Sequence, residues 1–335
     1  MKPLPFYWTL DRFINGIDNE LLQSLMHSQV KSCMKRVLLM PHSLHLIPPP
    51  IMANTSHNNP KSFKKDKFKS DNQSKSDKDY GLGVHTASNQ HNEKKFEFYW
   101  GHKNHVPVDC ITGLPIFELT TASDVHDSSV ALNILSQTNS FLPINDCTFT
   151  ADKAYDVKKI YNTVKIVYKG DCAIPLNKRN TKNPEKLLFG HPLCEAGFAM
   201  NKDGKTYDNG RTRQKYCCPF KQSEISVCPF NHGNWNNGKK NKGCTKYVTL
   251  PDDYRLSIDR DCISFKKIYS LRTEIERYNS HFKQTGQERL WIHGMNSTQN
   301  LNTIAHIFLL AAAYAAIVTH FPCSYRSLKS GKRIA

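Results

Sequence analysis

The segment from Tyr269 to Lys283 holds the side chains with the clearest chemical potential in this 335-residue chain. It contains neither proline nor glycine, so its sequence predicts a helix. At 100° per residue, Tyr269, Arg272, Glu276 and Lys283 fall within a stripe about 60° wide. A carboxylate framed by a phenol and two cations suits contact with a phosphodiester. The alternative is a solvated helix held by i,i+4 pairs such as Arg272–Glu276.

A second candidate carboxylate is Asp152, which directly follows the apolar segment Cys147–Ala151. That segment predicts a strand, and α/β sheets bind ligands and metals at the carboxyl ends of their strands. Asp152 is therefore a candidate metal ligand. The alternative is that it only caps the helix that follows.

Five cysteines and one histidine are concentrated in the 51 residues from 194 to 244, namely Cys194, Cys217, Cys218, Cys228, Cys244 and His232. Four thiolates can form a tetrahedral Zn²⁺ site. A segment with so few apolar residues needs a stabilising cross-link, such as a bound metal, to fold. The best candidate ligands are Cys194, Cys218, Cys228 and Cys244. Because the tight C-x2-C spacing is absent, free thiols in an unstructured insertion are the alternative.

Three motifs in the same order resemble bacterial insertion-sequence transposases of the DDE class. The helix resembles their Y-(2)-R-(3)-E-(6)-K signature, and residues 151–156 (A-D-K-A-Y-D) resemble the A-D-K-G-Y-D around their second catalytic aspartate. Residues 101–128 resemble a run of the form G-Y-K-x-H…D-x-x-T-G-L-P…A-x-x-H-D-S. The resemblance covers roughly residues 44–320, most of the chain.

The resemblance implies a DNA transposase that cleaves and transfers strands with Mg²⁺ or Mn²⁺ held by an Asp-Asp-Glu triad. Asp152 and Glu276 would bind metal. Tyr269, Arg272 and Lys283 would position DNA and neutralise its phosphates. The implied partners are element ends and target DNA, together with further copies of the chain assembled on them.

The first aspartate of that triad is missing. Its position in the family context L-D-S-T-P-I falls on Ile47, which three prolines follow. Because proline lacks an N–H and restricts the residue before it, we expect Ile47 to be extended and unpaired, so that Ile47→Asp alone would not restore activity. The chain should bind DNA but cleave it poorly. The alternatives are an inactive DNA-binding remnant and an unrelated zinc-containing nucleic-acid-binding module.

Other acidic residues have weaker claims. By resemblance, Asp109 opens a hairpin and Asp127 opens a helix, so both are structural. Asp66, Asp71 and Asp79 are the acids in a polar loop that could replace the missing ligand, although a mobile loop positions ligands poorly.

Composition supports a polyanionic partner. Lys and Arg exceed Asp and Glu by 46 to 29, giving a net charge of +17, and such a surplus predicts salt-dependent phosphate contacts. A basic protein without a nucleic-acid role is the alternative. The apolar run 304–318 is too short to span a bilayer and predicts a buried helix. Eleven cysteines without a secretory leader indicate a reducing cytoplasm.

The order of elements predicts an α/β fold with a ribonuclease-H-like mixed sheet flanked by helices. Strands are expected at 96–100, 106–110, 114–119, 147–151 and 172–176, with helices capped by Asp127 or Ser128 and at 156–168. We expect an N-terminal helical remnant at 1–43, a catalytic domain at 44–177 and 251–320, and an exposed, mobile loop at 54–80. A Cys-rich insertion at 178–250 and a basic tail at 321–335 complete the organisation.

Overall fold

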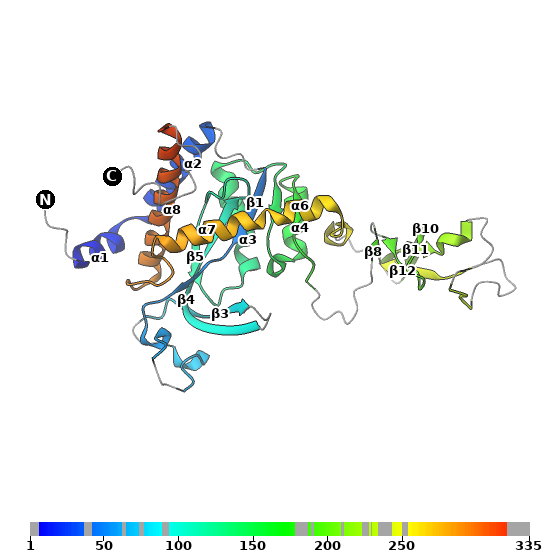
Figure 1. Cartoon of the computed structure of the whole chain (residues 1–335), viewed down its shortest axis with the longest axis horizontal. Helices are drawn as coiled ribbons and strands as arrows, with labels where there is room; N and C mark the ends of the chain where they lie inside the picture. Colours follow the sequence, from blue (N-terminus) through cyan, green and yellow to red (C-terminus); the bar gives the residue numbers. More distant parts are fainter. Residues whose placement is uncertain are drawn as a thin grey trace. The chain divides into compact units, whose positions relative to one another are not determined.

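The chain divides into two compact units, residues 1–174 with 267–335 and residues 175–266. The computed structural model describes residues 7–36, 42–61, 65–73, 77–88, 94–177, 187–188, 191–208, 211–222, 228, 230–233, 243–249 and 254–319 (Figure 1). The predicted basic tail at 321–335 lies outside the described residues.

The larger unit is a mixed α/β structure built on a seven-stranded sheet. Its centre is β1 (Ser43–Ile47), which pairs in parallel with β6 (Thr148–Thr150), and β7 (Asp171–Ala173) continues the parallel set beside β6. On its other side β1 pairs antiparallel with β4 (Lys94–Asp109). The carboxyl ends of three parallel strands therefore meet at one edge of the sheet.

The strand β4 organises the rest of the sheet. It pairs antiparallel with β2 (Pro50–Met52), β3 (Gly81–Ser88) and β5 (Leu119–Ala122). The expected break between two strands at 96–100 and 106–110 is wrong, because successive partners keep all 16 residues extended. The returning strand predicted at 114–119 also begins later, at Leu119, since Pro115 lacks an N–H and makes only an isolated bridge to Val108.

Helices flank this sheet. The predicted N-terminal helices are present as α1 (Tyr7–Gly16) and α2 (Asn19–Lys35), and both pack against α8 (Met295–Val318). The helices α3 (Asp127–Phe141) and α4 (Lys158–Ile166) pack against each other, while α7 (Arg272–Gln284) packs against β1 and crosses in front of the sheet in Figure 1.

The long helix α8 contains the apolar run that predicts a buried helix. By length and composition it is the one helix in the described part of the chain that could cross a membrane. It nevertheless buries Leu309, Leu310 and Ala313, and it buries Asn300 and His306 with hydrogen bonds to Ile14 O and Tyr278 Oη. Hydrogen-bonded polar groups facing protein are typical of a core helix, as expected.

The polar loop is held more firmly than its composition predicts. Asn58 donates to the carbonyl of Trp100 at 2.6 Å, and the Trp100 indole donates to the carbonyl of Lys67 at 2.8 Å. Ala53, Tyr80 and Trp100 form a small buried group beneath it. A few aromatic side chains thus anchor the described parts of a segment that polar composition alone marks as mobile. Its residues 62–64 and 74–76 lie outside the described residues.

The smaller unit contains a three-stranded antiparallel sheet of β10 (Asn201–Asp208), β11 (Arg211–Cys217) and β12 (Thr245–Thr249). A short pair, β8 (Leu187–Leu188) and β9 (His191–Pro192), precedes it. The short helix α5 (Tyr254–Ser257) and the first residues of α6 (Ile263–Ser270) follow.

A substitution at Gly101 can test how closely the strands approach one another around β4. A Cβ built there would lie 2.0 Å from the carbonyl oxygen of Ile51, a backbone atom that cannot rotate away. We expect Gly101→Ala to lower the free energy of unfolding by about 3 kcal/mol. Gly16→Ala is the matched control, because nothing lies within 4 Å of its Cβ position. Urea unfolding decides, and equal stabilities for the two variants would contradict the strand approach.

Candidate active site

The expected first two carboxylate positions follow the paired ends of the neighbouring strands β1 and β6. The parallel register ends with His45 opposite Thr150, so Ile47 and Asp152 each lie two residues beyond this last pair. Ile47 itself pairs with Val106 of β4. The expectation that the prolines leave Ile47 unpaired is therefore wrong. Ile47 keeps its own N–H, and pairing along β4 resumes at Pro50, opposite Lys103.

Asp152 closes β6 as predicted and also caps the short helix η3 (Lys153–Tyr155). Its Oδ1 accepts a hydrogen bond from Ala154 N at 2.7 Å. Although the residue is exposed overall, desolvation of its carboxyl group raises the pKa, and the charge of Asp127 adds to that rise. Lys153 and Arg272 act in the opposite direction. A carboxylate can accept about four hydrogen bonds, so the cap does not preclude a metal ligand.

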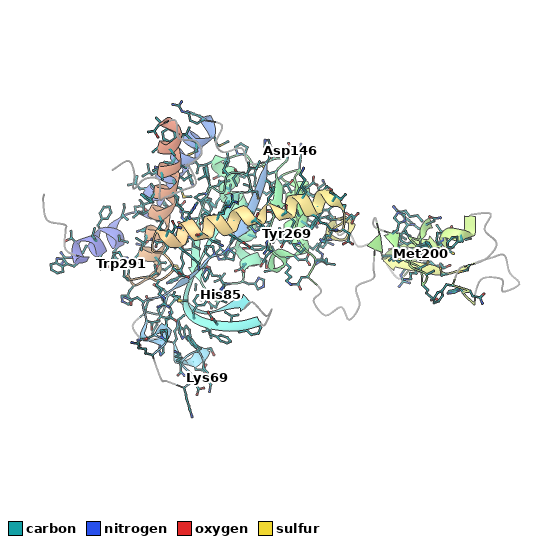
Figure 2. All side chains as sticks on the ribbon, in the orientation of Figure 1. Lys69, His85, Asp146, Met200, Tyr269 and Trp291 are labelled. Carbon is teal, nitrogen blue, oxygen red and sulfur yellow. The ribbon has the colours of Figure 1, made fainter. Side chains whose placement is uncertain are left out.

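The predicted signature helix is two helices. Tyr269 belongs to α6, Leu271 forms a turn, and α7 starts at Arg272. The three functional side chains still meet: Arg272 Nη1 donates to Tyr269 Oη at 3.1 Å, and Arg272 Nη2 lies 3.5 Å from Glu276 Oε1. All three belong to the larger unit, and Figure 2 labels Tyr269 on the ribbon in front of the sheet.

Arg272 contacts one candidate metal ligand and acts on the other only electrostatically. It contacts Glu276 directly, and its charge makes a small contribution that lowers the pKa of Asp152. An adjacent stripe of α7 is apolar, and Ile275, Tyr278 and Phe282 are buried against the sheet and α8. Packing of this stripe fixes the direction in which Arg272 and Glu276 project. The carboxylate-to-carboxylate spacing of about 4–8 Å that two shared ions require stays a prediction.

Lys283 is not part of this group. It lies 11 residues beyond Arg272, which is about 16 Å along a helix axis, and its Nζ contacts Glu288 Oε1 at 2.6 Å. It lines a cavity of about 610 Å³ together with Arg289 and the aromatic side chains of Phe68, Phe96 and Phe98. This combination of cations and exposed rings suits nucleic acid.

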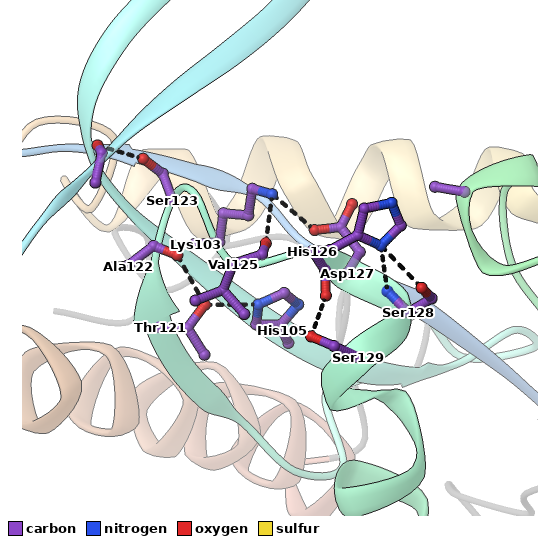
Figure 3. A network of polar contacts seen from close by, with 12 residues as sticks. Lys103, His105, Thr121, Ala122, Ser123, Val125, His126, Asp127, Ser128 and Ser129 are labelled. Carbon is purple, nitrogen blue, oxygen red and sulfur yellow. Dashed lines mark hydrogen bonds and ion pairs between the residues drawn. The ribbon is translucent and has the colours of Figure 1, made fainter. Parts of the chain in front are cut away.

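Lys103 and Asp127 form a part of the site that sequence reasoning missed. Lys103 Nζ lies 2.9 Å from Asp127 Oδ1 and donates to Val125 O at 3.0 Å (Figure 3). Asp127 begins α3, but His126 is the cap and accepts from Ser128 N at 3.3 Å, so the predicted Asp127 or Ser128 cap is wrong. His126 takes the extended conformation that a cap requires. In the sequence, the G-H-K-N-H motif at residues 101–105 was the signal that could have identified Lys103.

His45 is a second missed residue. It is buried on β1, and its Nδ1 lies 2.7 Å from Thr150 Oγ1 of β6. Burial, with a smaller contribution from the charge of Arg272, lowers the pKa of His45 to about 3. The imidazole is therefore neutral at ordinary pH and joins the two strands that carry Ile47 and Asp152.

The remaining acids are engaged elsewhere. Asp109 is buried and accepts from Thr112 N and Oγ1 at 3.0 and 2.6 Å, which confirms its structural role in the hairpin. Of the loop acids, Asp66 pairs with Lys69, Asp71 accepts from Ser70 Oγ, and Asp79 accepts from Met295 N at the start of α8. None of these contacts involves the Asp152–Arg272–Glu276 group.

The ligand set for a pair of divalent ions is incomplete. Across the described ranges, no group of three or more His, Cys, Asp or Glu side chains is arranged to hold a metal. Asp152 and Glu276 supply two carboxylates, whereas Ile47 contributes an apolar side chain packed against the cluster that includes Ile275. A two-ion centre needs a ligand that bridges both ions, and the residues present do not provide one.

Comparison with known proteins shows a family match over most of the chain. The family model described as "Transposase DDE domain" matches residues 65–312. No curated protein matches the chain. Among solved structures, a piggyBac transposase synaptic complex with hairpin DNA matches with a TM-score of 0.36 and 9% identity. That match covers 98% of this chain and 60% of the other.

Proposed function

Since the chain belongs to the transposase DDE domain family, we propose that it is an insertion-sequence transposase that binds DNA but is impaired in strand cleavage. One observation carries this proposal. Arg272 and Glu276 are in contact on α7, while Ile47 and Asp152 each lie two residues beyond the paired His45 and Thr150, so that Ile47 occupies the strand position where a further carboxylate would complete the set.

The sheet topology supports a ribonuclease-H-like catalytic domain. Its strands follow the order β5-β4-β1-β6-β7, with β1, β6 and β7 parallel and the β4 strand antiparallel to β1. The helix α3 connects β5 to β6, and α4 connects β6 to β7. The sequence-based prediction of the fold rests on the order of strands and helices along the chain.

Each side chain of the group has a distinct proposed task. Members of this family use divalent ions such as Mg²⁺ or Mn²⁺, and such ions activate the attacking water and stabilise the leaving oxygen. In this chain Arg272 neutralises a phosphate close to Asp152, and the Tyr269 hydroxyl orients its guanidinium. Lys283 and Arg289 extend the cationic contact along the DNA at the aromatic cavity.

The second candidate function is that of a fully inactive DNA-binding remnant. The apolar side chain of Ile47 at the expected metal-ligand position favours it. An unrelated zinc-containing nucleic-acid-binding module is not favoured, because the family match spans the Asp152 strand end and the Arg272 helix. The DNA that flanks the gene supplies the duplex for testing both candidates.

DNA binding through Arg272 is the first test. We expect Arg272→Gln to weaken binding to duplex ends and to reduce the slope of log K against log salt by about 1. Lys35→Gln removes the same charge from an exposed position on α2 and should have a smaller effect. Fluorescence anisotropy at several salt concentrations measures both. Indistinguishable variants, or a parent chain without salt-dependent binding, would refute the proposal.

A further inference from the structure

The four cysteines favoured by their sequence positions converge in the smaller unit. Cys194 packs with Met200 and Tyr216, whereas Cys218 packs with Cys228. Cys244 packs against both groups. Figure 2 labels Met200 at this small apolar centre.

The burial of these side chains agrees with this convergence, and Cys244 is partly buried. Cys194, Cys218 and Cys228 are each less than a tenth exposed. Four thiols from three separate stretches of sequence therefore share one interior.

The backbone repeats one turn after three of these cysteines. Gly197 N donates to Cys194 O at 2.9 Å, Lys221 N to Cys218 O at 3.1 Å, and Asn231 N to Cys228 O at 2.9 Å. Two of these turns end in the left-handed region, with φ of +82° at Gly197 and +47° at Asn231. Turns of this kind direct successive backbone N–H groups toward an anion, as in many metal–thiolate sites.

The apolar core of the smaller unit is too small to stabilise its fold alone. Among its described residues, the two buried groups contain Met200 and Tyr216 besides the cysteines, with Val248 and Phe220 partly buried beside them. A sheet with so little apolar cover needs a disulfide or a metal. The described cysteines are free thiols.

We infer that residues 175–266 fold around one Zn²⁺ ion bound by Cys194, Cys218, Cys228 and Cys244. Four thiolates complete a tetrahedral shell without an open position, so the site is structural rather than catalytic. The sulfurs do not yet have coordinating geometry, since no described group of three potential ligands does. In the zinc-bound form all four sulfurs would lie about 2.3 Å from the ion.

Neighbouring candidate ligands provide controls. Cys217 is the last residue of β11 and directly precedes Cys218, but it belongs to neither cysteine group. His232 lies 3.7 Å from Glu195 Oε1. Removal of Cys217 or His232 should therefore leave the zinc content unchanged.

Metal analysis of the full chain, purified without chelator, tests the inference. We expect one zinc per chain in the parent, Cys217→Ser and His232→Ala proteins. Cys244→Ser and Cys218→Ser should lose most of it. A parent chain without zinc, or a Cys244→Ser variant that retains one, would overturn the assignment.

Cobalt titration keeps the inference testable if a cysteine variant does not fold. Co²⁺ added to the metal-free parent should give intense tetrahedral and thiolate-to-metal absorption, with Zn²⁺ displacing it at one equivalent. A weak octahedral spectrum would contradict a four-thiolate site. Both measurements are independent of DNA binding, so they separate this inference from the proposed function.

Discussion

The parent chain is expected to leave DNA intact in Mg²⁺ and Mn²⁺, and Ile47→Asp is expected to give metal-dependent nicking at least about 100-fold above it. That ratio corresponds to about 2.7 kcal/mol of transition-state stabilisation. The structure reverses the expectation that this substitution would fail, because Ile47 is paired with Val106 and, like Asp152, lies two residues beyond the His45–Thr150 pair. An aspartate there would stand on a strand rather than on a loose segment.

Two further variants separate metal binding from other effects of this substitution. Ile47→Asn has nearly the same shape as Ile47→Asp but lacks the charge, so it should remain inactive. Glu276→Gln added to Ile47→Asp should abolish the gained nicking. A strand-nicking assay on DNA carrying the element ends compares them. A folded Ile47→Asp protein without activity would mean that position 47 does not complete the site.

One result from the parent chain would contradict this prediction. Nicking by the unmodified protein that disappears in Glu276→Gln would show that another acid already replaces the first aspartate. Asp127 would then be examined first, because its charge already acts on Asp152. Its ion pair with Lys103 would have to open for that role.

Sequence patterns predicted those parts of the candidate site whose structure depends on residues nearby in the sequence. The apolar segment before Asp152 predicts a strand end, and the helical spacing of Arg272 and Glu276 predicts their contact at 3.5 Å. Both inferences depend on neighbours within a few residues. The same holds for Asp109, whose partner Thr112 is three residues away.

Features that depend on distant partners were not predictable in this way. The pairing of Ile47 is determined by Val106 on another strand, which compensates for the prolines that follow it. The polar loop is anchored by Trp100, far along the sequence. His45 became recognisable as a link between strands only through Thr150. Tertiary contacts thus corrected propensities that were locally reasonable.

The buried carboxylate of Glu118 shows how such distant contacts control stability. It is fully buried and accepts hydrogen bonds from Gln23 of α2 at 2.7 Å, from Asn104 of β4 at 2.6 Å, and from Thr303 of α8. Thr120 of β5 donates as well, at 3.2 Å. One side chain therefore joins the N-terminal helices, the sheet and the long C-terminal helix.

Removal of this carboxylate is expected to be strongly destabilising. Glu118→Ala removes an acceptor that four side-chain donors share, so we expect a loss of about 3–5 kcal/mol in the free energy of unfolding. Glu97→Ala, at an exposed position of β4, should change it by less than about 0.5 kcal/mol. Urea unfolding of both variants provides the comparison, and similar losses would contradict the role of the network.

Glu118 should also make stability depend on pH. Burial raises its pKa to about 7 in the folded chain from the ordinary 4.5, although its hydrogen bonds oppose that rise. Between these two values the unfolded chain has released a proton that the folded chain retains. The contribution of Glu118 is therefore fully present below pH 4.5 and is lost as the pH rises through 7, by up to about 3 kcal/mol. Glu118→Gln cannot titrate, so the difference in unfolding free energy between parent and variant should shift against the parent across this range. A difference that stays constant from pH 4.5 to 7.5 would show that the carboxylate is ionised throughout and that its four donors outweigh its burial.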